Sequence, residues 1–543
     1  CVGVATIVVA SCSTPGLLWG SEFGGFDALS YHLQLPQEWL ELGRITPLEH
    51  NVYSFLPSYV ESAYTHLGSL AGGMLAGSGM ALVSCQLLHA LMTILAAGLL
   101  GRVCHALARM AGLDERARTA ARMTGWAATL VTPWTVVTGS LAYNEMAMLA
   151  FGAGAILCAM RDGLPASRRG ALSAFLTGMA CCCKPTAIFM VAPVVGLVLL
   201  VRVEPRSWSR TLIVGAAAGL ATISPWLIRN WLHGGNPVFP QLSGLFGSAH
   251  WTAEQVARYA AAHHSDLPLL DRAALLLWPE TGDPARPGAL VQRGLLHDQF
   301  FAFMPLVAVS LGGILFSRWR RRLLKPAALM SVGGCLQLLG WIVLTHQQSR
   351  FLLPMLLTGV PLIGLAMAMA VSEHTLQSEI PSGAQPKSAQ AYRRSIRLRR
   401  RTLMGTINTG LVVQAAWLVM LFAQQGRGDP NAFLLLTPRE RSGEAFGDEY
   451  QHASPAERRT IDANLPPEAY TRLALDKAAG VLYLLGDSTP LYFRTPLLYH
   501  TTYDASPLGL LMRAHPDDPA AWEAGLKQAG VTHVLLNLSE LER

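Results

Sequence analysis

Charged residues are scarce in this chain. Only 14% of its 543 residues are Asp, Glu, Lys or Arg, whereas 51% are hydrophobic, and the mean hydropathy is +0.32. A soluble globular domain carries roughly 25% charged residues. The deficit excludes an ordinary soluble protein and indicates that much of the chain faces lipid.

Cysteine spacing and charge distribution exclude further classes. None of the nine cysteines has the pair spacing of a zinc site, and none follows residue 335, so the C-terminal part has no disulfide framework. The net charge of +7 does not indicate a nucleic-acid partner, because Lys and Arg lie in short clusters between apolar runs. The chain begins without Met, inside an apolar run that we interpret as the remainder of a first transmembrane helix. A cleaved signal peptide is the alternative.

Long apolar runs alternate with basic clusters. A transmembrane helix needs about 20 apolar residues, and runs of about that length, some shorter, occupy residues 2–19, 77–101, 123–140, 146–160, 171–183, 186–201, 211–228, 301–317, 327–345, 351–371 and 403–424. Each basic cluster follows an even-numbered run, as the positive-inside rule requires of cytoplasmic loops. We therefore predict an all-α polytopic membrane protein with about eleven transmembrane helices.

The same pattern divides the chain into two domains. A transmembrane domain covers residues 1–424, with outer loops at 20–76 and 229–300 and a polar cytoplasmic linker at 372–402. Amphipathic helices are expected in the first loop around Asp27–Leu42 and Pro57–Leu67. Residues 425–543 have soluble composition and predict a small extracytoplasmic α/β domain, with strands at 481–485, 498–502 and 532–537 and a helix over 518–529.

Polar motifs gather at the outer ends of the predicted helices. Asp27 follows the first helix in a string that includes Tyr31 and His32, where it either caps the next helix or faces a water-filled cavity. The tight turn Tyr143-Asn144-Glu145 is by itself ordinary helix-start chemistry. Lys184 is a lone cation in an apolar hairpin, where it snorkels to the interface or faces an anionic ligand.

Two outer motifs contain arginine, against the charge bias of that side. Arg229 and Asn230 lie in Pro-Trp-Leu-Ile-Arg-Asn, and a phosphate or carboxylate partner would explain the cation there. Arg350 lies in a polar turn with His346 and Gln348, where snorkelling is the alternative to a lined cavity. Further possible ligands or bases have no metal-specific spacing; these are His263, His264, Asp266, His297 and Asp298.

Together these motifs resemble the GT-C superfamily of membrane glycosyltransferases, in particular bacterial families related to protein O-mannosyltransferases and lipid A aminoarabinose transferases. The strings that carry the resemblance lie at 27–32, 184–187, 225–240 and 349–354. Members of this superfamily move a sugar from a polyprenyl phosphate or diphosphate donor to an acceptor outside the cytoplasm. The resemblance therefore implies a multi-pass protein of the bacterial inner membrane that acts as a hexosyl- or pentosyltransferase on a glycan, lipid or protein.

The resemblance also implies roles for the polar residues. Asp27 corresponds to the catalytic acid of the first loop and is expected to act as general base, with Glu145 as a helper. Lys184, Arg229 and Arg350 are expected to bind the donor phosphate, and the expected substrate-binding residues are Tyr31, His32, Tyr143, Asn144, Asn230, His346 and Gln348. Better-known members have Asp-Glu in the first loop, but Ala28 follows Asp27 here, which leaves open whether Mg²⁺ or Mn²⁺ takes part.

Two other functions are consistent with the sequence. A transporter or flippase of lipid-linked saccharides would also place Arg near lipid phosphates, but its polar residues should lie along the middle of its spans. A non-catalytic membrane assembly factor is the second alternative. Convergence of Asp27, Lys184, Arg229 and Arg350 on one outer cavity would favour the glycosyltransferase.

Overall fold

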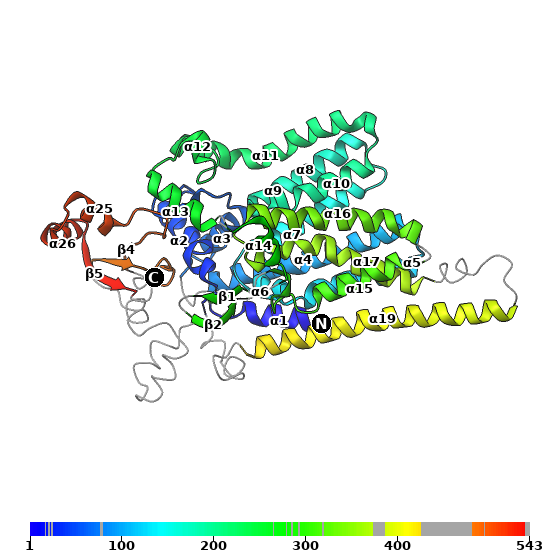
Figure 1. The fold of residues 1–543 in the computed structure, drawn as a ribbon. Helices are drawn as coiled ribbons and strands as arrows, with labels where there is room; N and C mark the ends of the chain where they lie inside the picture. Colours follow the sequence, from blue (N-terminus) through cyan, green and yellow to red (C-terminus); the bar gives the residue numbers. More distant parts are fainter. Residues whose placement is uncertain are drawn as a thin grey trace.

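A computed structural model describes all residues except 17, 20–21, 23–24, 76–79, 264, 266, 278–279, 284–285, 292–293, 318–319, 373–385, 425–479, 494 and 538–543. The described part of the chain is mostly helical, with a small parallel sheet near the C-terminus (Figure 1). This confirms the helical architecture predicted from the apolar runs. His264, Asp266 and most of the first half of the 425–543 domain lie outside the described residues.

Each apolar run contains one helix or two consecutive helices. Their bounds are α1 Val2–Ser11, α4 Met80–Met110, α5 Glu115–Val131, α6 Pro133–Ser140, α7 Glu145–Met160, α8 Ala166–Cys183, α9 Ala187–Met190, α10 Ala192–Arg202, α11 Trp208–Gly234, α15 Phe303–Leu315, α16 Arg320–Leu344, α17 Leu356–Val371 and α19 Pro386–Ala423. Proline explains two of the breaks, because a Pro cannot donate the hydrogen bond that would continue a helix. Pro133 begins α6, and Pro185 separates α8 from α9.

Five helical segments among the described residues are long and apolar enough to cross a membrane. They are Met80–Met110, Pro205–Gly234, Arg321–Leu344, Ser349–Val371 and Arg394–Ala423. A sixth exists if α6 and α7, which meet at an angle of 118°, count as one bent span. Shorter apolar helices cover Val2–Ser11, Ala187–Arg202 and Phe303–Leu315. The total of eleven spans stays a prediction.

Helix α17 lies inside the bundle, whereas α11 lies at its periphery (Figure 1). All residues of α17 up to Met369 are buried. Glycine permits a close approach between α4 and α5, since a Cβ added at Gly125 would lie 2.4 Å from the Cys104 sulfur. Large apolar side chains of α11, such as Ile213 and Leu232, are exposed. Exposed apolar surface of this kind is stable in lipid rather than in water.

Loops with predicted cytoplasmic basic clusters meet at one end of the bundle. Asp162, after α7, forms ion pairs with Arg109 of α4, at 3.3 Å, and with Arg202 of α10. Ser372, after α17, donates a hydrogen bond to Asp114, between α4 and α5, at 2.5 Å. These contacts join loops that follow the second, fourth, sixth and tenth apolar runs, as the predicted alternation requires.

Helix α19 begins inside the segment predicted as a linker. The helix starts at Pro386, and Arg400 donates a hydrogen bond to the Ser372 carbonyl at 2.7 Å. The sequence from 387 to 402 contains no Gly or Pro and is rich in Arg, a good helix former, so the helix continues beyond the apolar run. Residues 373–385 of the predicted linker lie outside the described part of the chain.

The outer loops contain short helices and one hairpin. The first loop forms η2 Ala28–His32, α2 Gln34–Leu42, η3 Val52–Phe55 and α3 Tyr59–Leu70. The loop after α11 forms α12 Ser243–Phe246, α13 Ala253–His263, α14 Leu269–Ala274, η5 Gly294–Leu296 and the antiparallel strands β1 Glu280–Asp283 and β2 Arg286–Val291. The turn before α17 is η6 Ser349–Met355.

The C-terminal segment forms a parallel sheet of order β4-β3-β5. The bounds are β3 Val481–Leu485, β4 Leu497–Leu498, α25 Pro507–Ala514, α26 Pro519–Gln528 and β5 Val531–Leu536. The strand predicted at 498–502 is wrong beyond its first residue. Thr501 instead donates a hydrogen bond to Asp504 at 2.5 Å, and such local side-chain bonding competes with a strand ladder.

Asp504 fastens the C-terminal domain to both outer loops. Its carboxylate is buried and accepts hydrogen bonds from the Val52 amide and the Trp251 indole, each at 2.9 Å. The C-terminal sheet therefore lies at the end of the bundle that holds the first loop, opposite the basic loops (Figure 1).

Candidate active site

Arg350 is the centre of a buried cluster of charges. The Arg350 side chain lies in η6 and is only 8% exposed. It forms an ion pair with Glu22, a second with Asp27 at 2.6 Å, and a third in which Nε lies 3.3 Å from Glu145 Oε1. The three carboxylates come from the first loop and from the start of α7. An arginine that snorkelled to the interface would not have three carboxylate partners that are each at most 21% exposed, so that alternative is wrong.

Lys184 joins this cluster through Glu145. The chain leaves α8 at Lys184, and its Nζ lies 2.5 Å from Glu145 Oε1. Glu145 is 2% exposed and Lys184 is 14% exposed, so the pair is largely desolvated. The Phe351 ring lies beside both cations, 5.0 Å from Lys184 Nζ and 5.8 Å from Arg350 Cζ. We call Glu22, Asp27, Glu145, Lys184 and Arg350 the Arg350 cluster.

The two first-loop carboxylates have different proton affinities. Asp27 directly precedes η2 but does not cap it, since its carboxylate accepts from Arg350 rather than from a backbone amide. Burial acts to raise the pKa of Asp27, but the charges of Arg350, His32 and Lys184 outweigh it and lower this pKa. Burial raises the pKa of Glu22 to about 7, against the opposing effect of Arg350. At neutral pH, Asp27 is thus ionised while Glu22 is poised to exchange a proton.

Three of the predicted substrate-binding residues, His32, Tyr143 and Asn144, pack beside the cluster and hold its members in position. His32 Nδ1 lies 2.5 Å from Glu61 Oε1, which also accepts a hydrogen bond from Asn144 at 3.1 Å. The Tyr143 hydroxyl donates to Glu22 at 3.2 Å, and its ring lies 5.0 Å from Arg350 Cζ. These contacts fix the turn before α7, and with it the position of Glu145.

Arg229 and Asn230 do not contact the Arg350 cluster among the described interactions. Arg229 donates to the Ser54 carbonyl at 2.7 Å and stacks 4.1 Å from the Trp226 ring centre. Asn230 donates to the Phe55 carbonyl at 2.7 Å. The string around Arg229 therefore holds the η3 segment by its backbone, and the expected convergence of four residues is reduced to three.

The η3 segment in turn contacts the helix that follows Asp27. Tyr53 of η3 stacks on Tyr31 of η2, with ring centres 4.3 Å apart. Arg229 is thus connected to the site through Ser54 and Tyr53. Its Nη1 is buried without a hydrogen-bond partner among the described residues.

His346 and Gln348 flank the cluster differently. The His346 ring lies 5.0 Å from that of Phe351 and 5.5 Å from that of His263. The Gln348 side chain is exposed, while its carbonyl accepts a hydrogen bond from the Trp341 indole at 2.9 Å. The Gln348 carbonyl also accepts a hydrogen bond from the Phe351 amide at 3.1 Å, so His346 touches Phe351 through its ring and Gln348 touches it through the backbone.

Sequence reasoning missed Glu22 and Glu61. Glu22 lies five residues before Asp27. The first loop therefore does contain a second carboxylate near Asp27, on its N-terminal side rather than directly after it. Glu61 is 3% exposed in α3, and no local motif marks it. Within the described residues, no group of three or more His, Cys, Asp or Glu side chains is arranged to hold a metal ion. Arg350, rather than a cation-sized space, lies between Glu22 and Asp27.

Comparison with known proteins identifies the fold. No protein-family model matches the chain, and no curated protein matches it in sequence. The crystal structure of ArnT from Cupriavidus metallidurans bound to undecaprenyl phosphate gives a TM-score of 0.54 at 12% identity, over 98% of this chain and 88% of ArnT. The apo structure of the same protein gives 0.54 at 15% identity, over 98% and 87%.

A structure of the arabinofuranosyltransferase AftD from Mycobacteria gives a TM-score of 0.46 at 14% identity, over 98% of this chain and 34% of AftD. The likeness to ArnT shows that this chain has the GT-C-type fold, as the sequence motifs predict. Together with its apolar helices, the fold shows an integral membrane protein.

Proposed function

We propose that this protein is a membrane glycosyltransferase that takes a sugar from a polyprenyl-phosphate or diphosphate donor and attaches it to an acceptor outside the cytoplasm. The observation that carries the proposal is the Arg350 cluster, in which a carboxylate base and two cations meet at one end of the bundle. The fold supports it, because ArnT, which shares this fold, has been crystallised with undecaprenyl phosphate.

Asp27 is the general base of the proposed reaction. Its pKa is lowered, so it is ionised and ready to accept a proton at neutral pH. It takes the proton of an acceptor hydroxyl as that oxygen forms a bond to the anomeric carbon of the donor. The anomeric carbon–oxygen bond to phosphate breaks, and its electron pair leaves with the phosphate. A nearby carboxylate also stabilises the positive charge that develops on the sugar.

Arg350 and Lys184 bind the donor phosphate, which gains negative charge as it leaves. Both cations are paired with carboxylates in the structure, so a bound phosphate would take the place of part of that pairing. When Arg350 turns from Asp27 to phosphate, Asp27 loses the cation that lowers its pKa and becomes a stronger base. Donor binding thereby activates the base.

Glu145 is better placed to position Lys184 and Arg350 than to exchange protons with substrate, because it is 2% exposed and touches both cations. Arg229 and Asn230 hold the η3 segment in place. We assign His346, Tyr31 and Tyr143 to the surroundings of the sugar. The proposed steps use Arg350 and Lys184 as the cations and are not routed through a metal ion.

We further propose that the Arg350 cluster, the two outer loops and the C-terminal domain lie outside the cytoplasm. The cluster and the basic loops occupy opposite ends of the bundle, and basic loops remain in the cytoplasm. The proposed eleven spans place the C-terminal domain on the outer side with the first loop.

Purified protein in lipid nanodiscs, supplied with a panel of polyprenyl-phosphate sugars and membrane extract as acceptor, tests the function. We expect sugar transfer accompanied by release of polyprenyl phosphate. Translocation of the intact lipid-linked sugar across liposome membranes, without cleavage, would instead show a flippase.

A further inference from the structure

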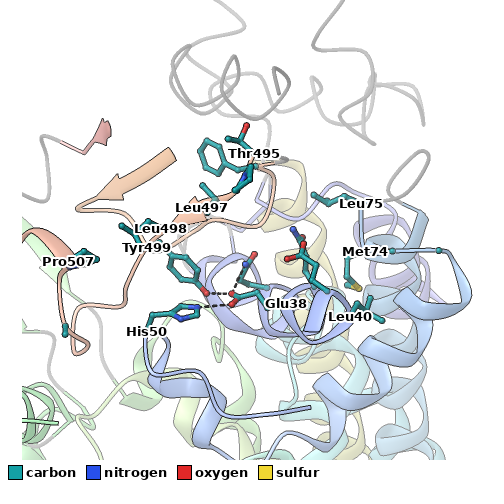
Figure 2. Close-up of a pocket in the computed structure, with 18 residues that line it drawn as sticks. Glu38, Leu40, His50, Met74, Leu75, Thr495, Leu497, Leu498, Tyr499 and Pro507 are labelled. Atoms are coloured by element: carbon teal, nitrogen blue, oxygen red, sulfur yellow. Dashed lines mark hydrogen bonds and ion pairs between the residues drawn. The ribbon is translucent and has the colours of Figure 1, made fainter. Parts of the chain in front are cut away.

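A cavity of about 690 Å³ lies between α2 and the C-terminal domain (Figure 2). One wall is the face of α2, and the other is the segment around β4. None of the five residues of the Arg350 cluster lines this cavity. Its volume falls within the range of about 300–1,000 Å³ that is usual for small-molecule sites.

Hydrogen-bond acceptors form the wall contributed by α2. Gln34, Gln37, Glu38 and Glu41 all line the cavity, and their spacing of three and four residues places them on one helix face. Leu35 and Trp39 pack on a different face, against Leu48. The sequence of α2 thus separates an apolar side from a polar side that faces the cavity.

The described part of the lining disfavours an anionic ligand. Among the described residues it contains no Lys or Arg, and its histidine, His50, is paired with Glu38 at 2.8 Å (Figure 2). Glu38 also accepts hydrogen bonds from Gln34, at 2.9 Å, and from the Tyr499 hydroxyl. Among the described lining residues, a phosphate would meet the carboxylates of Glu38 and Glu41 and no unpaired cation, so this part of the lining suits a neutral or cationic ligand better than the donor's phosphate.

Two acceptor atoms of the wall have no partner. The side-chain oxygens of Gln34 and Gln37 are buried without a hydrogen bond among the described residues, and Gln34 is only 3% exposed. Buried polar atoms normally have a hydrogen-bond partner, because a buried donor or acceptor without a hydrogen bond costs free energy. Both oxygens are closed to solvent here, so donors of a ligand would reach them only after the Gln34 or Gln37 side chain turns toward the cavity.

Apolar side chains complete the lining. Met74 and Leu75 lie at one side, and Leu497 and Leu498 lie at the other (Figure 2), while Phe493 also contributes to the lining. A ligand that complements this lining has hydroxyl or amine donors beside apolar patches. A sugar ring has such a surface, because its edge is polar and its C–H faces are apolar.

We propose that this cavity binds a neutral or amine-bearing saccharide, the carbohydrate end of the acceptor. The inference rests on the proposed function, since it names the acceptor class of that reaction. A hydrogen-bonded path connects the cavity to the site: Asn51 donates to the Tyr499 hydroxyl at 3.2 Å and to the Ser30 carbonyl at 3.1 Å. Ser30 belongs to η2, the helix that begins after Asp27.

Saturation-transfer NMR on the full chain in nanodiscs tests binding with three probes of similar size. These are a trimer of N-acetylglucosamine, which is neutral, a trimer of glucosamine, which carries amines, and a trimer of galacturonic acid, which is anionic. We expect the first two to bind and the third not to bind. Binding of only the anionic trimer, or of none, would overturn the proposal.

Substitution of Glu41 supplies the site-specific test. Glu41 is exposed at the cavity, so Glu41→Gln and Glu41→Lys should fold. We expect Glu41→Lys to weaken the amine-bearing trimer at least tenfold and Glu41→Gln to weaken it less, with undecaprenyl phosphate binding unchanged. Glu49→Lys is the matched control, because Glu49 is an exposed acid of the same loop outside the lining.

The transfer assay separates this inference from the proposed function. Leu497→Trp should obstruct the cavity, raise the acceptor KM and leave undecaprenyl phosphate binding intact. Wild-type transfer by both Leu497→Trp and Glu41→Lys, with transfer still dependent on Asp27, would overturn the inference and leave the function standing. If the neutral trimer binds but no donor supports transfer, the acceptor role and the proposed function are both wrong. The saccharide-binding site itself would still stand.

Discussion

At the scale of single residues, the main feature is that one guanidinium serves three carboxylates. Arginine can do this because its five N–H donors point in several directions in one plane, whereas a lysine ammonium is a point charge. Three acids around two cations also leave a surplus negative charge when Glu22 is ionised. In a site of this composition, a carboxylate can take up a proton and release Arg350 or Lys184. The released cation can then bind the donor phosphate.

Glu22 should make donor binding depend on pH. Its pKa is raised to about 7 by burial, in surroundings that contain Arg350, Lys184, Asp27 and Glu145. Below pH 7 Glu22 is neutral and competes little for Arg350, while above pH 7 it is ionised and competes with the phosphate. We therefore expect the donor KM to rise between pH 6 and pH 8, and Glu22→Gln to remove most of that rise. An identical pH profile in the variant would contradict this role.

The two outer arginines should respond differently to lysine. Arg350→Lys keeps the charge but loses the fork that reaches several partners, so we expect donor KM to rise and kcat to fall, by tenfold or more. Arg229→Lys removes stacking and a backbone hydrogen bond outside the cluster, so we expect a smaller effect. Steady-state kinetics with a polyprenyl-phosphate sugar decides between them. Equal changes in donor KM and kcat in both variants would show that Arg229 also binds the donor phosphate.

At the scale of elements, two helix breaks bring Glu145 and Lys184 together. Glu145 begins α7 after the break that follows α6, and Lys184 lies at the break after α8. Removing one member of a buried ion pair leaves the other charge uncompensated, at a cost of about 3–5 kcal/mol. We expect Glu145→Gln and Lys184→Met each to lower the thermal stability of the protein. The double variant should recover much of the loss. Additive losses in the double variant would show that the two side chains act independently.

Much of the fold and part of the site could be predicted from sequence at this scale. Apolar runs and proline breaks depend on local chemistry, so the helices fell where the runs lie. The outer ends of the predicted helices contain Asp27, Glu145, Lys184 and Arg350, which is why the sequence predicts these site residues, and the structure brings them together. Glu61 is held by packing in α3, which no local pattern reveals.

Arg229 shows the limit of the argument from charge bias. An arginine on the cation-poor side needs a partner, but backbone carbonyls and an indole ring supply it as well as a phosphate would. Which partner is present depends on how η3 folds against α11, and that contact joins residues about 175 positions apart. Sequence spacing alone could not distinguish the two.

At the scale of the whole molecule, the proposed site requires opposite ends of the bundle to lie on opposite sides of the membrane. Reporter fusions after residues 60, 165, 270, 322 and 450 test this. We expect fusions at 60, 270 and 450 to report the outer side, and those at 165 and 322 the cytoplasm. A cytoplasmic signal at 450 would contradict the orientation and the position proposed for the site.

The central claim is that Asp27 is the base of a glycosyl transfer at the Arg350 cluster. The most direct measurement is the transfer rate of purified Asp27→Asn beside Asp162→Asn, whose ion pairs lie at the other end of the bundle. Both variants should insert and fold, as checked by gel filtration and thermal unfolding. We expect Asp27→Asn to lose about 10²- to 10⁴-fold in rate, as removal of a general base typically does, and Asp162→Asn to stay near wild type. Wild-type transfer by a correctly folded Asp27→Asn protein would contradict the account.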